Sequence, residues 1–311
     1  PAGFYTGVQT LSITVPAGTA VFYTRNGDNP VWTDPMYTGP ITIDSTQVIR
    51  ARAFALSGTD LPSHTITNSY FINENITLPV ISLCTDSVNL WDWNTGIYVS
   101  GPNADTTIPY SNSNFWMPWK KQAHTEFFAK NKVLGFEQDC ATEIHGNFSR
   151  AWPQKSFRIM ANDDYQDPYI NYKLFPDKNI TKFKSFNIRN AGIDWNTCHF
   201  RDRLMHDIVQ QKTDIDIMDG EACVLFLNGR YWGVYEMRER QDENYIAQNH
   251  NVDPDSIDLL RFEGDILEGS NAAFYSMVGF LANNSMTIQA NYDSAQKLID
   301  KKVKIVGLDS Y

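Results

Sequence analysis

The stretch Ile144-His-Gly-Asn-Phe-Ser-Arg-Ala-Trp-Pro-Gln-Lys-Ser-Phe-Arg-Ile159 is the most informative part of the chain. A polar turn around Gly146 leads into a segment that alternates like a β-strand. Because successive side chains on a strand point to opposite faces, Lys155, Phe157 and Ile159 share one face. A cation beside two core-type residues is costly unless an anionic group meets it. Lys155 is therefore the first functional candidate. The alternative is structural, with a buried stem and an ammonium that reaches water.

The composition limits the classes of protein to which the chain can belong. The 311 residues are enough for one to three domains, and the 42% of hydrophobic residues can form a large core. The net charge of -10 excludes a non-specific nucleic-acid binder and disfavours an anionic membrane surface, because both need basic residues on the protein. No apolar run approaches the roughly 18 residues of a membrane span.

The cysteines are Cys84, Cys140, Cys198 and Cys223. Zinc sites use short, regular spacings, and these residues are widely and irregularly spaced, so we do not expect them to bind zinc. Each lies in or near an apolar segment. We expect buried free thiols, with one disulfide as the alternative.

Residues 1–72 have the pattern of a small all-β sandwich. Short apolar or alternating segments are separated by clusters of glycine, proline and asparagine. The expected strands cover residues 8–15, 20–24, 41–43, 48–54 and 65–72. We place a sandwich domain at residues 1–73 and a linker at 74–79.

Residues 80–311 mix strands and helices without a regular alternation, which favours an α+β domain. Strands are expected at 80–83, 124–128, 141–144, 155–160 and 184–188, and a long loop at 99–118. Asn228-Gly229 between two apolar runs is the strongest short-range signal for a β-hairpin. Short helices are expected near 242–249, 271–281 and 294–302.

A longer helix is expected at 197–211, because apolar residues recur there at helical spacing. They form one stripe of Phe200, Leu204, Met205, Ile208 and Val209. Arg201 and Asp202 lie off this stripe, and their structural explanation is a solvated or ion-paired helix face.

Several blocks in residues 3–72 belong together. They are Val21-Phe-Tyr-Thr24, Gly27-Asp-Asn-Pro30, Tyr37-Thr-Gly-Pro40, Ile49-Arg-Ala-Arg-Ala-Phe54 and Tyr70-Phe71. This segment resembles the chitobiase/β-hexosaminidase C-terminal-type domain, although Asn26-Gly27 stands where members of that family commonly have Asp-Gly. The resemblance implies an Ig-like sandwich of the kind appended to secreted proteins, and it does not imply glycosidase activity.

A second set of blocks runs in order from about Leu78 to the end of the chain. It comprises Leu78-Pro-Val-Ile-Ser-Leu83, Gly96-Ile-Tyr-Val99, Ile144-His-Gly-Asn-Phe-Ser-Arg150, Gln154-Lys-Ser-Phe-Arg-Ile159, Phe175-Pro-Asp-Lys178, Arg189-Asn190, Asp194-Trp195, Phe200-Arg-Asp202, Phe226-Leu-Asn-Gly-Arg-Tyr-Trp-Gly-Val-Tyr235, Arg238-Glu239 and Val252-Asp-Pro-Asp255. The set resembles the CotH kinase family, which is named for a spore-coat protein and is distantly related to protein kinases. It implies a protein-kinase-like α+β domain at residues 80–311.

The resemblance also implies a nucleotide site with ATP and Mg²⁺ as cofactors. A strand lysine, here Lys155, would contact the phosphates, and the Gly146 turn would lie over them. The segment 236–239 would pass near the adenine. The implied nucleotide-binding residues are Lys155, Gly146, Asn147, Ser149, Glu236, Glu239, Arg189 and Arg201.

Structural explanations remain open for several of these positions. His145 is expected to be a hydrogen-bonded structural histidine. Glu236, Arg238 and Glu239 could form no more than an exposed strand edge. The tryptophans that we expect to pack in the core and in loops, in preference to forming a sugar platform, are Trp91, Trp93, Trp116 and Trp119.

We therefore expect a secreted or envelope protein kinase of the CotH type that phosphorylates a protein substrate, such as a surface or coat protein. The metal-binding and catalytic carboxylates are expected beyond Tyr311, so the kinase-like domain is expected to be incomplete and this chain inactive by itself. The alternative is a non-catalytic surface or adhesion protein with a pseudokinase body and a carbohydrate-binding sandwich at residues 1–73. A glycoside hydrolase accessory module is a third, weaker alternative.

Overall fold

The computed structural model describes residues 1–58, 60–213 and 215–302, and the chain divides into two compact units. Unit 1 comprises Pro1–Phe200 and Gly220–Arg238. Unit 2 comprises Arg201–Asp219 and the described residues from Glu239 onward. The described chain is mostly β, with few helices.

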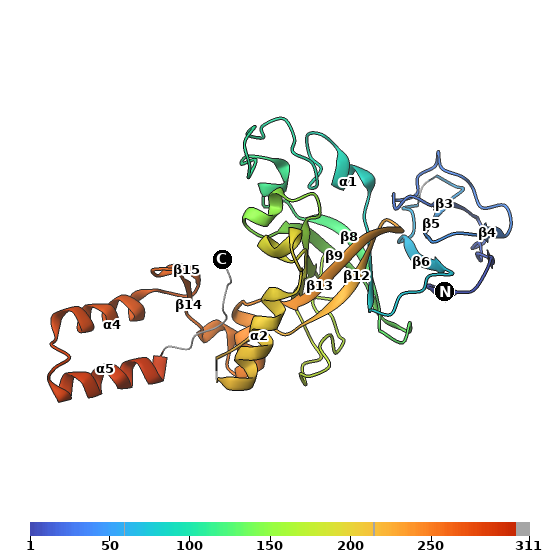
Figure 1. The fold of residues 1–311 in the computed structure, drawn as a ribbon. Helices are drawn as coiled ribbons and strands as arrows, with labels where there is room; N and C mark the ends of the chain where they lie inside the picture. The colour runs from blue at the N-terminus through green and yellow to red at the C-terminus, as the bar shows by residue number, and fades with distance from the viewer. Residues whose placement is uncertain (59, 214, 303–311) are drawn as a thin grey trace. The chain divides into compact units, whose positions relative to one another are not determined.

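The first part of unit 1 is a β domain of two sheets (Figure 1). Its strands are β1 (Gly3–Tyr5), β2 (Gln9–Leu11), β3 (Thr19–Thr24), β4 (Ile41–Ile43), β5 (Gln47–Ala55) and β6 (Ile66–Ile72). A 4-stranded sheet has the order β1-β6-β5-β3, and β2 pairs with β4 in the second sheet. Ile43 of β4, Ile49 of β5 and Ile72 of β6 meet in one buried cluster. The core therefore comes from alternate side chains of these strands, as in a sandwich.

The rest of unit 1 is a closed barrel. Its strands are β7 (Val80–Cys84), β8 (Lys121–Phe128), β9 (Leu134–His145), β10 (Ser156–Ala161), β11 (Ser185–Arg189), β12 (Gly220–Leu227) and β13 (Arg230–Glu239). They follow one another around the barrel in the order β10-β11-β13-β12-β7-β8-β9. Figure 1 shows β8, β9, β12 and β13 as long, curved strands. Every strand contributes side chains to one buried apolar cluster, so the barrel is filled and has no open lumen.

The alternation along β8 distinguishes the inside of the barrel from the outside. Phe127 belongs to the interior cluster, whereas Phe128 belongs to a second cluster with Phe71 of β6 and Phe226 of β12. The ring of Phe71 lies 5.2 Å from that of Phe128 and 4.9 Å from that of Phe226. The sandwich and the barrel thus share a buried aromatic contact within unit 1.

The predicted hairpin at Asn228-Gly229 is confirmed. It joins β12 to β13, and both turn residues have positive φ, 51° for Asn228 and 75° for Gly229. This is the backbone that a two-residue turn between twisted strands requires. The turn also packs on β5, because a Cβ on Gly229 would lie only 2.6 Å from the backbone nitrogen of Val48.

Short helical segments lie in the connections of unit 1. They are α1 (Ser87–Trp91) and the 3₁₀ segments η1 (Asn114–Trp116), η2 (Phe148–Ala151) and η3 (Gly192–Asn196). The expected long loop at 99–118 contains η1 and no longer regular element.

Unit 2 carries most of the helices. Its elements are α2 (Arg201–Lys212), α3 (Glu243–His250), the 3₁₀ segment η4 (Pro254–Ser256), β14 (Leu259–Arg261), β15 (Asp265–Glu268), α4 (Ala272–Asn283) and α5 (Gln289–Lys302). The helices expected near 242–249, 271–281 and 294–302 are present. α4 and α5 lie alongside each other (Figure 1). The short antiparallel pair of β14 and β15 has no counterpart in the sequence-based expectation.

The packing of α2 differs from the usual arrangement of an amphipathic helix, which buries its apolar stripe. Phe200, just before the helix, and Leu204 are 60% and 45% exposed. Asp202 and His206, one helical turn apart, are buried instead, with their side chains 3.9 Å apart. The apolar stripe therefore faces outward, and the face that carries Asp202 and His206 is the buried one.

The cysteines are free thiols. Cys84, Cys140 and Cys223 are buried as predicted, but the prediction is wrong for Cys198, which is exposed just before α2. Its thiol donates to Asp194 over 3.1 Å, so a polar turn takes the place of the expected apolar surroundings.

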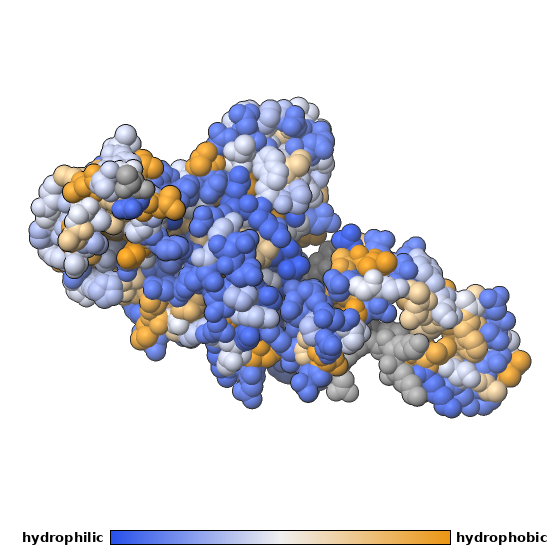
Figure 2. All heavy atoms as spheres, turned by 180° about the vertical axis from the view of Figure 1, so that it is seen from behind, coloured by the Kyte–Doolittle hydropathy of each residue, from blue (hydrophilic) through white to orange (hydrophobic). Residues whose placement is uncertain are grey.

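None of the helices in the part of the chain that the structure describes has both the length and the apolar character of a membrane span. On the face drawn in Figure 2, hydrophobic residues form separate patches on a mainly hydrophilic surface.

Candidate functional site

The turn between β9 and β10 is the centre of the candidate site. Gly146 begins the turn with φ 116°, and a Cβ there would lie 2.6 Å from Oγ of Ser149, so only glycine fits without displacing that side chain. Arg150 closes the turn, since its Nε donates to the carbonyl of Gly146 over 2.5 Å and its guanidinium donates to the carbonyl of Phe115 over 2.9 Å. The turn is therefore held in one conformation by its own side chains.

Lys155 lies at the end of this turn and is only 5% exposed. Its Nζ donates to the carbonyls of Arg150 over 2.6 Å and Trp152 over 3.1 Å. The same ammonium lies 3.8 Å from the ring centre of Phe115 and 5.5 Å from that of Tyr98. Aromatic faces and carbonyl oxygens thus surround the cation. Among the described residues, no carboxylate lies within ion-pair distance of it.

The burial of Lys155 changes the pKa of its amine. Desolvation lowers the pKa of Lys155 from 10.5 to about 8. At neutral pH most of the amine still carries its charge. A polyanion that reached Nζ would therefore meet a cation whose charge is balanced by no acidic side chain of the described residues.

Asn190, at the end of β11, connects the turn to the next strand and is fully buried. Its Oδ1 accepts hydrogen bonds from Oγ of Ser156 over 2.8 Å and from the backbone of Gly192 over 3.0 Å. Its amide donates to the carbonyls of Gln154 over 2.5 Å and Ser149 over 3.4 Å. Asn190 therefore fixes the backbone on both sides of Lys155, a role that the sequence pattern did not reveal.

Two stacked tryptophans complete this network. The indole of Trp152 donates to the carbonyl of Gly192 over 3.0 Å and stacks on Trp195 with ring centres 5.6 Å apart. The indole of Trp195 donates to Oε1 of Gln154 over 2.8 Å. These contacts hold η3 against the start of β10.

The structure brings together four of the residues implied by the resemblance. Gly146, Asn147 and Ser149 form the turn at whose end Lys155 lies, and Asn147 is exposed at its tip. Arg189 is half-buried at the end of β11, beside Asn190. His145 is hydrogen bonded as expected, because its Nδ1 accepts from Arg158 over 2.7 Å.

The remaining residues lie on β13 and in unit 2. Glu236 alternates along β13 with Tyr235 and Met237, which both belong to the interior cluster, so Glu236 faces the outside of the barrel. It pairs there with Arg238 over 3.0 Å. Glu239, which belongs to unit 2, accepts from the backbone of Asp219 over 2.8 Å. All three residues at positions 236, 238 and 239 are buried, so the exposed strand edge is wrong as an explanation for them. Arg201 is exposed at the start of α2, also in unit 2.

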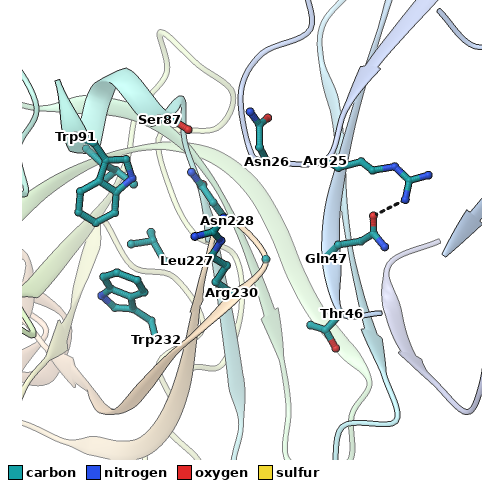
Figure 3. A pocket seen from close by; sticks show the side chains of 12 residues that line it. Arg25, Asn26, Thr46, Gln47, Ser87, Trp91, Leu227, Asn228, Arg230 and Trp232 are labelled. Atoms are coloured by element: carbon teal, nitrogen blue, oxygen red, sulfur yellow. Dashed lines mark hydrogen bonds between the residues drawn. The ribbon is translucent and has the colours of Figure 1, made fainter. Parts of the chain in front are cut away.

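A cavity of about 470 Å³ lies within unit 1, between loops of the sandwich and the β12–β13 hairpin (Figure 3). Its lining residues are Arg25, Asn26, Thr46, Gln47, Ser87, Leu90, Trp91, Leu227, Asn228, Gly229, Arg230 and Trp232. Trp91 and Trp232 also pack on Tyr98, whose ring centre is 5.0 Å and 5.6 Å away. Figure 3 shows both indoles on the barrel side and the hydrogen-bonded Arg25 and Gln47 on the sandwich side. Carbohydrate binding by the sandwich at residues 1–73 stays a prediction.

Two family models match the chain. The model of the Chitobiase/beta-hexosaminidase C-terminal domain matches residues 1–67, and that of the CotH kinase protein family matches residues 142–310. A search of the curated proteins found no match. The kinase-family match begins within β9, so the blocks at 78–83 and 96–99 lie outside it, although β7 is a strand of the barrel.

These findings define a kinase-like protein that carries a β domain at residues 1–67. The CotH match covers more than half of the chain. The chain therefore belongs to the CotH kinase family.

Proposed function

We propose that this protein is a secreted or envelope protein kinase that transfers the γ-phosphoryl group of ATP to a protein substrate. Membership of the CotH kinase family supports the reaction class. The single observation that carries the proposal is the buried ammonium of Lys155, which has no carboxylate partner among the described residues and sits at the end of a tightly held glycine turn. The α+β kinase-like organisation and the location outside the cytoplasm belong to the same proposal.

In this proposal the turn and Lys155 position phosphate. The oxygens of a nucleotide phosphate would form charge-assisted hydrogen bonds with the Nζ ammonium. The carbonyls and aromatic rings that now surround this ammonium are weaker partners for it. During transfer the bond between the γ-phosphorus and the bridging oxygen breaks while a bond to a substrate hydroxyl forms, and the hydroxyl loses its proton. ADP leaves with the bridging oxygen. The hydrogen bonds of Asn190 keep the turn in place while the bond to the bridging oxygen breaks and the bond to the substrate forms.

Mg²⁺ would neutralise phosphate charge in such a reaction. The residues around Lys155 offer carbonyls, rings and amides, and no carboxylate among them is placed to hold this ion. We therefore assign no magnesium ligand in the described residues.

The test uses the complete protein, Mg²⁺ and ATP labelled on the γ-phosphate. We expect phosphate incorporation by the wild type and a loss of about 100-fold in Lys155→Met, which keeps the length of the side chain without its charge. ATP should also raise the unfolding midpoint of the wild type but not that of the variant.

The matched control is Lys130→Met, which removes an exposed lysine and should label like the wild type. Equal labelling by wild type and Lys155→Met would remove Lys155 from the site. Absence of both labelling and ATP-dependent stabilisation in the wild type would contradict the kinase proposal itself.

A further inference from the structure

Four acidic or imidazole side chains meet on the outer face of the barrel, away from Lys155. β8 carries His124 and Glu126, and β9 carries Glu137 and Asp139. In the strand register, His124 is opposite Asp139 and Glu126 is opposite Glu137. Residues two apart on a strand share a face, and the next one along β8 is Phe128, which packs outside the barrel. All four side chains therefore lie together on that outer face.

The pairing of Glu126 with Glu137 is unfavourable by itself. Like charges directly opposite on neighbouring strands repel. Glu126 is also fully buried, so its carboxylate has lost its contact with water. Among the described residues, no lysine or arginine forms an ion pair with Glu126. The carboxylates of Glu126 and Glu137 therefore lack a neutralising cation among the described residues.

Two buried atoms of this cluster have no hydrogen-bond partner. Oε1 of Glu126 accepts from the backbone of Ser69 over 3.1 Å, which leaves Oε2 unpartnered. Nδ1 of His124 bonds to Oδ1 of Asp139 over 2.7 Å, which leaves Nε2 unpartnered. In a neutral imidazole, a proton on Nδ1 directed at the carboxylate of Asp139 leaves the lone pair on Nε2. A histidine oriented by a carboxylate through its other nitrogen is the usual arrangement at metal sites.

We propose that His124, Glu126 and Glu137 bind a divalent transition-metal ion of the Zn²⁺ type. One ligand atom from each residue lies within 4.8 Å of the other two, so modest side-chain rotation brings all three to one ion. One imidazole and two carboxylates suit Zn²⁺ better than Mg²⁺, which prefers oxygen ligands alone. Glu137 is exposed, so the ion can enter from solvent and retain a water molecule as a further ligand.

The site would strengthen a contact inside unit 1. Glu126 is already hydrogen bonded to Ser69 of β6, so an ion on Glu126 links the barrel strands β8 and β9 to the sandwich. A ligand that binds only the folded state raises the free energy of unfolding. The proposal therefore predicts a metal-dependent stability of unit 1, independent of any kinase activity.

The experiment measures Zn²⁺ binding to tag-free protein in a Cys198→Ser background, because an exposed thiol can also bind zinc. Equilibrium dialysis followed by elemental mass spectrometry should find one tightly bound Zn²⁺ per chain, with a raised unfolding midpoint, and no comparable binding of Mg²⁺. Glu137→Gln should abolish both effects. Its side chain is exposed, so we expect this variant to fold. Asp139→Asn should weaken binding by about 10–100-fold through the loss of histidine orientation.

The matched control is His64→Ala, which removes an exposed histidine and should bind Zn²⁺ like the parent. Co²⁺ provides an independent readout, because its visible absorption reports the coordination geometry, which His124→Ala would change. Equal Zn²⁺ binding by the parent and Glu137→Gln would overturn the proposal, as would a parent that binds neither Zn²⁺ nor Co²⁺.

Discussion

At the scale of single residues, Lys155 shows how a cation can be kept in an apolar place. Two carbonyls and two aromatic rings contact its ammonium, and no carboxylate does so among the residues described. These partners compensate for only part of the lost hydration, so the pKa of the amine falls to about 8.

This lowered pKa predicts a pH-dependent contribution to stability. Lys155 has a pKa of about 8 when folded and 10.5 as its ordinary value. Between these values the unfolded chain binds more protons than the folded one, so the free energy of unfolding rises with pH, by at most about 1.4 kcal/mol per pH unit. The difference between wild type and Lys155→Met should therefore grow in favour of the wild type from pH 8 to pH 10 and become flat below about pH 7. Urea unfolding at a series of pH values measures it.

Lys130→Met is the control for this measurement, because Lys130 is exposed and its replacement should leave the pH dependence unchanged. A constant difference between wild type and Lys155→Met across the whole range would mean that the amine of Lys155 is not desolvated.

The sequence reveals Lys155 but not the residues that support it. Strand alternation places Lys155 on the same face as Phe157 and Ile159, and the sequence of this short segment alone is enough to show it. Asn190, by contrast, contacts residues 34 to 41 positions earlier in the chain. Such a contact depends on how β10 and β11 pair, and no local pattern encodes it. The cluster of His124 with Glu137 is hidden for the same reason, since it needs the register of β8 on β9.

At the scale of elements, local signals are confirmed where the neighbouring residues alone determine the structure. Asn228-Gly229 predicts the β12–β13 turn because both residues tolerate positive φ. The apolar stripe of α2 is different, since a helix buries the face that its partners cover. In unit 2 the buried face includes Asp202 and His206, and an apolar pattern cannot report that choice.

Two glycine substitutions distinguish the cost of backbone strain at positive φ from the cost of losing the close contact between the Gly229 turn and β5. Gly229 and Gly18 have nearly the same φ, 75° and 74°, but only Gly229 faces another strand, with the nitrogen of Val48 2.6 Å from the position of a Cβ. Gly18→Ala should cost about 1 kcal/mol through backbone strain. Gly229→Ala should cost about 1–3 kcal/mol more, because the turn must move away from β5.

Urea unfolding of the two variants measures this difference. Equal losses of unfolding free energy in Gly18→Ala and Gly229→Ala would show that the turn does not need its close approach to β5.

At the scale of the whole molecule, unit 1 joins the sandwich and the barrel through a shared aromatic cluster. Phe71 of β6 is fully buried between Phe4, Phe128 and Phe226. Polar contacts accompany it, including the bond from Ser69 to Glu126 and the ion pair of Arg50 with Asp86 over 3.4 Å. The two parts therefore have a common core, which is the physical basis for unfolding as one cooperative unit.

Phe71→Ala tests this cooperativity. Removing the ring should lower the free energy of unfolding by about 3–5 kcal/mol. Hydrogen exchange followed by mass spectrometry should show faster exchange in β5 of the sandwich and in β7 and β12 of the barrel by the same factor, because a shared core opens as a whole. Leu61→Ala, at a position that is 93% exposed, should stay within about 0.5 kcal/mol of the wild type. Faster exchange in β5 with unchanged exchange in β7 would mean that the sandwich opens independently and that the cluster around Phe71 joins the two parts without coupling their stability.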